Sequence, residues 1–248
     1  MKRVFLVTAI ATMFNAQVAH AQDAAPTAKP EHEFSFNAAL VSDYRYRGIS
    51  QTRLKPALQG GVDYVNNASG FYAGAWASTI KWTKDAGGSG SVEVDLYAGK
   101  RGSLTSDASY DVGVLTYVYP SNGLAVSANT TEIYGQINYG SAYAKYSHST
   151  TNLFGFANSK NSGYLDIGAN IEIKNGLVLN LHAGHQRVNH NSISSYTDWK
   201  VGITKDLGVF NAALAVIGTN ANKLAYASPA NGKFLGKTAV VATVSKNF

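Results

Sequence analysis

Cysteine is absent from this chain, and charged residues are scarce. The 248 residues contain no Cys and only 15% Asp, Glu, Lys and Arg, against about 25% in ordinary soluble domains. The lack of Cys excludes a disulfide framework and a Cys-based metal site. It also suits an exported bacterial protein, because periplasmic oxidants would act on free thiols.

Long apolar runs are missing too. No segment has 18 consecutive apolar residues, so no transmembrane helix is expected. If this protein enters a membrane, it must do so as a closed β-barrel, because only a helix or a closed barrel satisfies backbone hydrogen bonds in hydrocarbon.

Basic residues are not concentrated in any run. The net charge is +6, and Lys and Arg are scattered along the chain. A nucleic-acid-binding protein would usually gather its basic residues in a patch or stripe. Nucleic acid is therefore not an expected partner.

The first 21 residues have the features of an export signal. Lys2 and Arg3 precede an apolar stretch, residues 4–14, that is too short to span a membrane. Ala19-His20-Ala21 is a typical cleavage site, so cleavage after Ala21 is expected. Residues 22–33 read as a disordered periplasmic lead-in rich in Ala, Pro and charge. The domain expected after them is a barrel over residues 34–248.

Alternation of apolar and polar residues dominates the rest of the chain. It predicts an all-β, single-chain antiparallel transmembrane barrel of about twelve strands. The predicted strands are 34–47, 57–65, 71–82, 92–101, 110–119, 132–139, 142–148, 164–174, 177–186, 196–205, 210–218 and 237–248. A soluble β-sandwich also alternates, but its strands are usually about 5–6 residues long. Most of these segments approach the 9–11 residues of a tilted spanning strand.

The connections between these segments alternate in length. Short turns are predicted at 66–70, 140–141, 175–176 and 206–208, and longer loops at 48–55, 83–90, 120–131, 149–163, 187–195 and 219–236. Short periplasmic turns and long outer loops are typical of outer-membrane barrels. Only 102–109 departs from the alternation, since it is predicted to be a periplasmic turn but is not short. An even number of strands places both termini in the periplasm.

The aromatic residues gather near the ends of the predicted segments, as in the interfacial girdles of membrane barrels. The first segment is predicted to turn Phe34, Phe36 and Leu40 outward together with two tyrosines of its outer end. The girdle would contain Tyr44, Tyr46, Tyr64, Tyr72, Trp82, Tyr110, Tyr119, Tyr139, Tyr164 and Tyr196.

The block over residues 41–52, VSDYRYRGISQT, is the most specific part of the sequence. With the stretches at 56–64 (PALQGGVDY) and 69–78 (SGFYAGAWAS), it resembles the TorF family of porin-like proteins, long described only as conserved proteobacterial proteins of unknown function. The resemblance implies an outer-membrane barrel with a transport role, and it brings no catalytic residues. The final Phe248 is similar to the terminal aromatic residue that the barrel-assembly machinery reads. Lys246 departs from that pattern, which usually has an apolar residue there.

Charged residues on the inward faces are the candidate site, because rings of charge set the selectivity of a water-filled pore. The predicted lining and mouth residues are Asp43, Arg45, Arg47, Arg53, Lys55, Asp63, Glu93, Asp95, Asp166, Glu172 and Lys200, with Asp111, Lys145 and Asp198 on the same faces. Among them, Arg45, Arg47, Arg53 and Lys55 predict a basic outer mouth on one side of the barrel, which would favour anionic solutes. The expected function is thus a porin-like channel for small hydrophilic solutes, without an enzymatic activity or a cofactor, in contact with outer-membrane lipid. The oligomeric state is left open.

Three alternatives to an open channel remain. Mutually paired charges could plug a barrel of this size. The Asn- and Ser-rich loops 149–163 and 219–236 could serve adhesion. A lipid hydrolase would need a Ser and a His in contact. His190-Asn191-Ser192 has the His-x-Ser spacing that puts both side chains on one face of a strand, but it lies in a predicted loop, and His148-Ser149-Thr150 is a poorer match. His182 and His185 lie three residues apart, so they face opposite sides of a strand and cannot share a metal ion.

Overall fold

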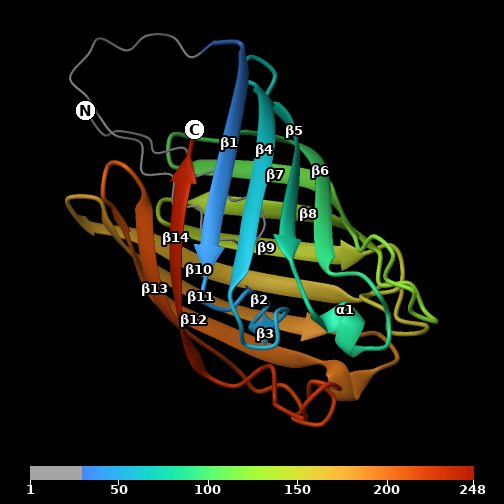
Figure 1. Ribbon diagram of the computed structural model, residues 1–248. Helices are drawn as coiled ribbons and strands as arrows, with labels where there is room; N and C mark the ends of the chain where they lie inside the picture. Colours follow the sequence, from blue (N-terminus) through green and yellow to red (C-terminus); the bar gives the residue numbers. More distant parts are fainter. Residues whose placement is uncertain (1–29) are drawn as a thin grey trace.

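A computed structural model describes residues 30–248 of the chain. Twelve antiparallel strands close into a barrel in which each strand pairs with its neighbour in sequence, and the first pairs with the last (Figure 1). The barrel strands are β1 (His32–Val41), β4 (Ala57–Asn66), β5 (Phe71–Thr79), β6 (Val92–Ser103), β7 (Ala108–Val118), β8 (Thr130–Tyr139), β9 (Ala142–Ser149), β10 (Gly163–Lys174), β11 (Leu177–Arg187), β12 (Tyr196–Asp206), β13 (Asn211–Thr219) and β14 (Ala239–Asn247).

Little other regular structure is present in the described part. Two short strands, β2 (Arg45–Tyr46) and β3 (Ile49–Ser50), form a separate two-stranded sheet. A one-turn helix, α1 (Trp82–Asp85), and a 3₁₀ turn (Ser192–Ser194) lie in loops. None of the helices in residues 30–248 is long and apolar enough to cross a membrane.

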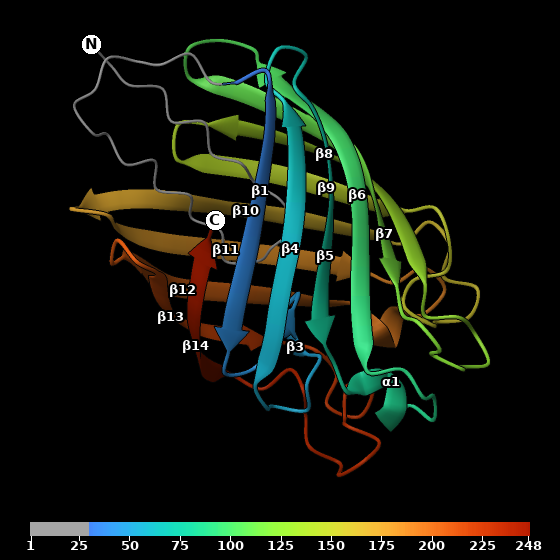
Figure 2. The ribbon, with the colours of Figure 1, turned by 45° about the horizontal axis from the view of Figure 1, so that its top comes forward.

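The predicted strand pattern is confirmed almost throughout. Eleven of the predicted segments match a barrel strand to within about two or three residues at each end, and all six longer loops lie at the end of the barrel opposite the described chain ends (Figures 1 and 2). The periplasmic turn predicted at 102–109 spans only residues 104–107 in the structure, because β6 and β7 are longer than predicted. The leader and its cleavage site after Ala21 lie outside the described residues, and so does most of the lead-in, although β1 already begins at His32.

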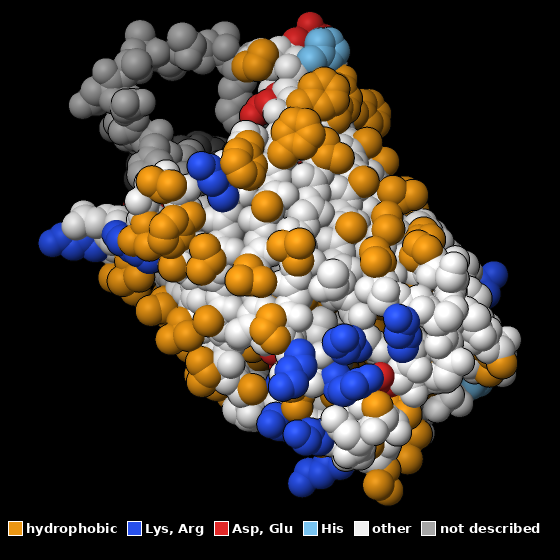
Figure 3. All heavy atoms as spheres, in the orientation of Figure 1, with side chains coloured by type: hydrophobic (Ala, Val, Ile, Leu, Met, Phe, Trp, Pro, Cys, Tyr) orange, Lys and Arg blue, Asp and Glu red, His pale blue; other side chains and the backbone are white. Residues whose placement is uncertain are grey.

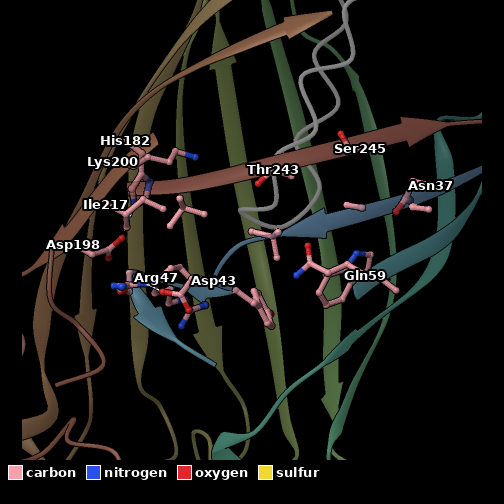
Figure 4. Close-up of a pocket in the computed structure, with 18 residues that line it drawn as sticks. Asn37, Asp43, Arg47, Gln59, His182, Asp198, Lys200, Ile217, Thr243 and Ser245 are labelled. Atoms are coloured by element: carbon pink, nitrogen blue, oxygen red, sulfur yellow. Dashed lines mark hydrogen bonds and ion pairs between the residues drawn. The ribbon is translucent and has the colours of Figure 1, made fainter. Parts of the chain in front are cut away.

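The predicted first strand is wrong beyond Val41. Val41 pairs with Ala57 and with Thr243, and the ladder stops there. The chain then turns inward, and residues 42–56 connect β1 to β4 through a hairpin inside the barrel, around β2 and β3 (Figure 4). The segment becomes exposed again at Lys55 and Pro56, just before β4. We call this segment the inward hairpin. The strand 71–82 also ends early, at Thr79, so that Trp82 opens helix α1.

The outer face of the barrel is apolar. Exposed large apolar side chains follow the outward positions of most strands, among them Phe34, Leu58, Ile167 and Val244, and they form the belt in Figure 3. A continuous apolar exterior around a closed sheet is the expected surface of a barrel that faces lipid.

The aromatic girdle is wrong for more than half of its predicted members. Five of them, Tyr44, Tyr72, Tyr119, Tyr164 and Tyr196, are buried inside the barrel, and Tyr46 and Trp82 pack against the buried core. Tyr72 is among the buried core residues together with Trp76, Tyr97 and Tyr117. The interior beside β5, β6 and β7 is therefore filled by aromatic rings, which leaves open space mainly on the other side.

Candidate functional site

The inward hairpin is held together by a carboxylate at its start. Asp43 accepts hydrogen bonds from Arg45 Nε at 2.6 Å and from Ser50 Oγ at 2.5 Å. Arg45 also donates through Nη1 to the carbonyl oxygens of Gly48 and Lys237 at 3.0 and 2.9 Å. This buried network bends residues 43–50 into a compact unit, because each arm of the hairpin supplies a partner to the other.

Arg47 fixes the tip of the hairpin to the far wall of the barrel. Its Nη2 donates to Glu132 Oε2 in β8 at 2.7 Å, and its Nη1 donates to Gln186 Oε1 in β11 at 2.5 Å. Its guanidinium also stacks 4.1 Å from the ring centroid of Tyr164. Burial alone would lower the pKa of Arg47, but the Glu132 carboxylate outweighs that effect and raises it. The tip therefore carries a permanently charged anchor.

Two tyrosines of the hairpin anchor it to the opposite side. Tyr44 donates to Glu93 Oε1 at 2.7 Å, and Tyr46 shares a 2.6 Å hydrogen bond with Tyr117. Burial and the neighbouring Glu93 carboxylate raise the pKa of Tyr44, so its phenol stays protonated as a donor. Both tyrosines face into the barrel, contrary to the prediction that they point outward to the membrane.

Gly48 makes the closest approach between the hairpin and the wall. Its φ is +77°, and a Cβ placed on it would lie 2.4 Å from Thr219 Cγ2 and 2.8 Å from Asp198 Cβ. Glycine is required here both for the left-handed backbone and for space. The hairpin thus reaches from the end of β1 to β12 and β13 on the other side of the interior.

A cavity lies between the hairpin and the barrel wall. Water-sized molecules can occupy about 70 Å³ of it, within about 820 Å³ of non-atom space that includes open solvent. Figure 4 shows Asn37, Gln59, Thr243 and Ser245 on one wall, His182, Asp198 and Lys200 on the other, and Arg47 and Asp43 on the hairpin between them. The lining combines these polar and charged side chains with apolar ones, among them Val41, Trp76 and Ile217.

His182 sits between two carboxylates in this wall. Its Nδ1 lies 2.7 Å from Asp166 Oδ1, and its Nε2 lies 2.7 Å from Asp198 Oδ2. His185 is exposed on the outside, 3.0 Å from Thr197 Oγ1. The prediction that these two histidines face opposite sides is confirmed. No group of three or more metal-ligating side chains in residues 30–248 is arranged to hold a metal ion.

The structure places the predicted site residues in three groups. Asp43, Arg45, Arg47, Asp166 and Lys200 surround the cavity or its wall, with Asp198. Glu93 and Asp95 lie in the packed half beside Tyr44, and Asp95 has no hydrogen-bond partner among the described residues. Asp63 accepts from Tyr97 at 2.6 Å, whereas Glu172 is exposed on β10 near the end of the barrel that carries the chain ends.

The basic outer mouth is only partly present. Arg45 and Arg47 are buried and paired with Asp43 and Glu132, so neither is exposed at a rim. Arg53 forms an ion pair with Asp85 of helix α1. Lys55 is exposed. Three of the four predicted basic groups therefore have their charge compensated by a carboxylate.

Glu132, the partner of Arg47, is the interior carboxylate that the sequence pattern missed. The predicted strand began at this residue and assigned it to neither face, whereas β8 starts at Thr130. Counting back in steps of two from the inward Gln136 would have placed Glu132 on the lumen side. A buried arginine in the hairpin then needs such a carboxylate.

Neither of the two His–Ser spacings forms a catalytic pair. The exposed His190 has its Nδ1 3.0 Å from the carbonyl oxygen of Asn158. The buried Ser149 donates its hydroxyl to the carbonyl oxygen of Thr151 at 2.6 Å. A hydrolase would need the imidazole to accept the proton of the serine hydroxyl, and these partners are backbone groups instead.

Comparison with known proteins gives a family and a fold. A family model described as a bacterial protein of unknown function (Gcw_chp) matches residues 24–248. No curated protein matches the sequence. The match does not confirm the TorF name.

Solved structures share the barrel at very low identity. A structure described as KdgM porin is 8% identical, covers 86% of this chain and 98% of its own, and gives a TM-score of 0.55. One from a study of in-meso crystallization of membrane proteins is 9% identical, with coverages of 87% and 83% and a TM-score of 0.52. LpxR from Salmonella typhimurium is 10% identical over 86% and 99% of the chains, but its TM-score of 0.42 supports no argument.

Proposed function

This chain belongs to the Gcw_chp family, and from its closed barrel and polar cavity we propose that it is a porin-like channel of the outer membrane. The solutes are small and hydrophilic, and they diffuse passively. The observation that carries this proposal is the combination of an apolar exterior with a charged interior crossed by one hairpin. We also propose that the chain is a TorF-type porin, a name to which its residues 41–82 point.

The inward hairpin sets the constriction in this proposal. Arg47 and Gly48 reach the far wall at Glu132, Asp198 and Thr219, so solutes must pass beside the tip or wait for it to move. Buried ion pairs and close backbone contacts favour one defined position. The channel should therefore be narrow, with a conductance that depends on how firmly the hairpin is seated.

Single-channel recording in a planar lipid bilayer tests this function. Purified, refolded protein is expected to give discrete conductance steps, and a salt gradient then gives the charge preference from the reversal potential. If neither the correctly folded wild-type barrel nor a variant that lacks the hairpin gives any conductance steps, the channel function is contradicted.

A barrel with a plugged lumen is the second candidate. The aromatic packing beside β5 to β7 and the anchored hairpin favour it, because interiors of smaller barrels are often filled by side chains. The protein would then have a structural or adhesive role through its long outer loops. In that case the wild type would be silent, and removal of loops 150–162 and 220–238 would abolish surface attachment.

We also propose that the barrel-assembly machinery recognises Phe248 and that outer-membrane lipid surrounds the assembled barrel. Phe248 is exposed, and its backbone N–H donates to Phe36 O at 2.9 Å, so its ring stands beside the apolar belt where the barrel-assembly machinery and then lipid would contact it. Truncation of Phe248 is expected to reduce the amount of assembled barrel in the outer membrane, measured as the heat-modifiable band on a gel.

A further inference from the structure

The outer loops carry a strong excess of positive charge. Six connections lie at the end opposite the described chain ends, 42–56, 80–91, 119–129, 150–162, 188–195 and 220–238. Apart from Asp43, Arg45 and Arg47, which are buried in the inward hairpin, they contain eight Lys or Arg and one acidic residue. That residue, Asp85, forms an ion pair with Arg53. Four lysines, Lys55, Lys81, Lys84 and Lys237, are exposed, and no ion pair within residues 30–248 uses them. We call these four the outer lysine patch.

Three members of the outer lysine patch lie next to the ends of three nearby strands. Lys55 lies two residues before β4, Lys81 two residues after β5, and Lys237 two residues before β14. In the barrel these strands are adjacent, with only β1 between β14 and β4. The loops also contact one another, since the N–H of Lys81 donates to Gln51 O at 2.8 Å. Residues far apart in sequence thus meet on one side of the barrel.

The outer lysine patch borders the apolar belt. Leu58 and Val240 are 64% and 62% exposed on the outside of the barrel. Each lies three residues from a patch lysine, which is at most about 11 Å of chain. Figure 3 shows Lys and Arg side chains gathered beside the apolar surface at this end of the molecule. A lysine at this height can place its stem against lipid chains and its ammonium group among headgroups.

We propose that the outer lysine patch binds the phosphate groups of lipid in the outer leaflet of the membrane. The inference rests on the membrane placement of the proposed function, but it does not require a conducting pore. Ammonium groups bind phosphate as point charges, and basic residues close to an anionic lipid surface each strengthen binding about fivefold. The patch lies on the outside of the wall next to the belt, which favours a lipid headgroup over an anion in the lumen.

Native mass spectrometry of the full barrel in detergent micelles tests the proposal. Diphosphoryl lipid A is titrated against wild type, the Lys55→Gln/Lys81→Gln variant and a matched Lys160→Gln/Lys223→Gln variant. The last pair removes two outer-loop lysines that do not adjoin β14, β4 or β5. The patch variant is expected to bind at least tenfold more weakly, and the control pair less than twofold.

Two further ligands, monophosphoryl lipid A and inorganic phosphate, show whether the bound phosphate belongs to a lipid. Monophosphoryl lipid A is expected to bind more weakly than the diphosphoryl form, and inorganic phosphate at millimolar concentration is expected to leave lipid adducts on wild type. Equal weakening in both double variants, equal binding of the two lipids, or full displacement by inorganic phosphate would overturn the proposal. Conductance of the same variants in a neutral phosphatidylcholine bilayer separates this result from the channel function, because that lipid has no net charge.

Discussion

At the scale of single residues, the contact between Arg47 and Glu132 determines where the hairpin stops. Both side chains are almost fully buried, and the ion pair spans from the hairpin tip to β8. Removing one member of a buried pair leaves the other charge uncompensated, which typically costs about 3–5 kcal/mol. The Arg47→Ala variant is therefore expected to lose about that much free energy of unfolding and to release the tip.

Denaturant unfolding and single-channel conductance measure these two effects together. Lys55→Ala is the matched control, since it removes an exposed basic residue of the same segment and should change stability by less than about 0.5 kcal/mol. The double variant Arg47→Ala/Glu132→Gln should recover part of the loss, because no buried charge is then left alone. If the Arg47→Ala variant is as stable as the Lys55→Ala control, the ion pair does not hold the hairpin.

Gly48 gives a second prediction at this scale. Gly48→Ala would place a methyl group against Thr219 and Asp198 and would also force a left-handed residue. Gly232→Ala is a close control, because Gly232 has φ +69° but nothing within 4 Å of its added Cβ. The free energy of unfolding of the control should fall only by the left-handed backbone strain, about 1–2 kcal/mol. Gly48→Ala should also displace the hairpin and increase conductance. Identical conductance in the two variants would contradict a closed tip.

Sequence alternation assigned most single residues to the correct face, and its failures have one cause. Phe34, Leu58 and Ile167 were predicted outward and are exposed. Tyr44 and Tyr46 were assigned by continuing the alternation past the point where the ladder ends. Period-two counting holds only while the partner strands of the barrel fix the pleat, and the ladders of β1 with β4 and β14 end at Val41.

At the scale of elements, the inward hairpin is the largest feature that the sequence pattern did not predict, beside the short helix α1. A hint was available, since the predicted first strand of 14 residues exceeds the 9–11 that a tilted strand needs to span the membrane. The direction in which the surplus folds depends on Glu93, Tyr117, Glu132 and Gln186, which lie on β6, β7, β8 and β11. Such contacts between distant strands have no local signature.

Replacing residues 44–51 by a short Gly-Ser turn tests the hairpin as an element. The barrel strands keep all their ladder partners, because β2 and β3 pair only with each other. The variant should therefore still assemble, and its single-channel conductance should rise several-fold over wild type. A folded variant with unchanged conductance would place the constriction elsewhere, for example in the aromatic packing beside β5 to β7.

At the scale of the whole molecule, the interior and the outer surface carry opposite charge. The described interior holds eight carboxylates and five Lys or Arg, with His182 between two of the carboxylates, so acidic side chains outnumber basic ones. The carboxylates are Asp43, Asp63, Glu93, Asp95, Asp111, Glu132, Asp166 and Asp198, and the basic residues are Arg45, Arg47, Arg101, Lys145 and Lys200. An excess of carboxylates in a pore favours cations, in contrast to the anion preference expected from a basic mouth.

The reversal potential in a salt gradient decides between these preferences. Wild type is expected to prefer cations weakly, and Asp63→Asn should reduce that preference, because Asp63 is partly exposed and accepts a hydrogen bond from the neutral Tyr97. Glu31→Gln is a control that removes an exposed carboxylate outside the strands. A wild type that prefers anions would mean that the outer lysines, rather than the interior, set the selectivity.

The architecture as a whole was readable from the sequence because three independent patterns agreed. Strand alternation, the order of short and long connections, and the even strand number all indicated one closed barrel. The charge balance of the lumen was not readable in the same way. It depends on which charged residues pair with each other across the interior, as Arg47 does with Glu132 and His182 with Asp166 and Asp198.

The pairing of β1 with β14 has a consequence for how the molecule forms. Residues 37–41 are hydrogen bonded to residues 243–247, so the last seam joins segments separated by almost the whole described chain. Until β14 is made, β1 has an unpaired edge that lipid cannot satisfy. Closure must therefore follow completion of synthesis, and its long chain separation makes it intrinsically slow. A chain that stops before β14 is an open sheet exposed to proteolysis rather than a smaller pore.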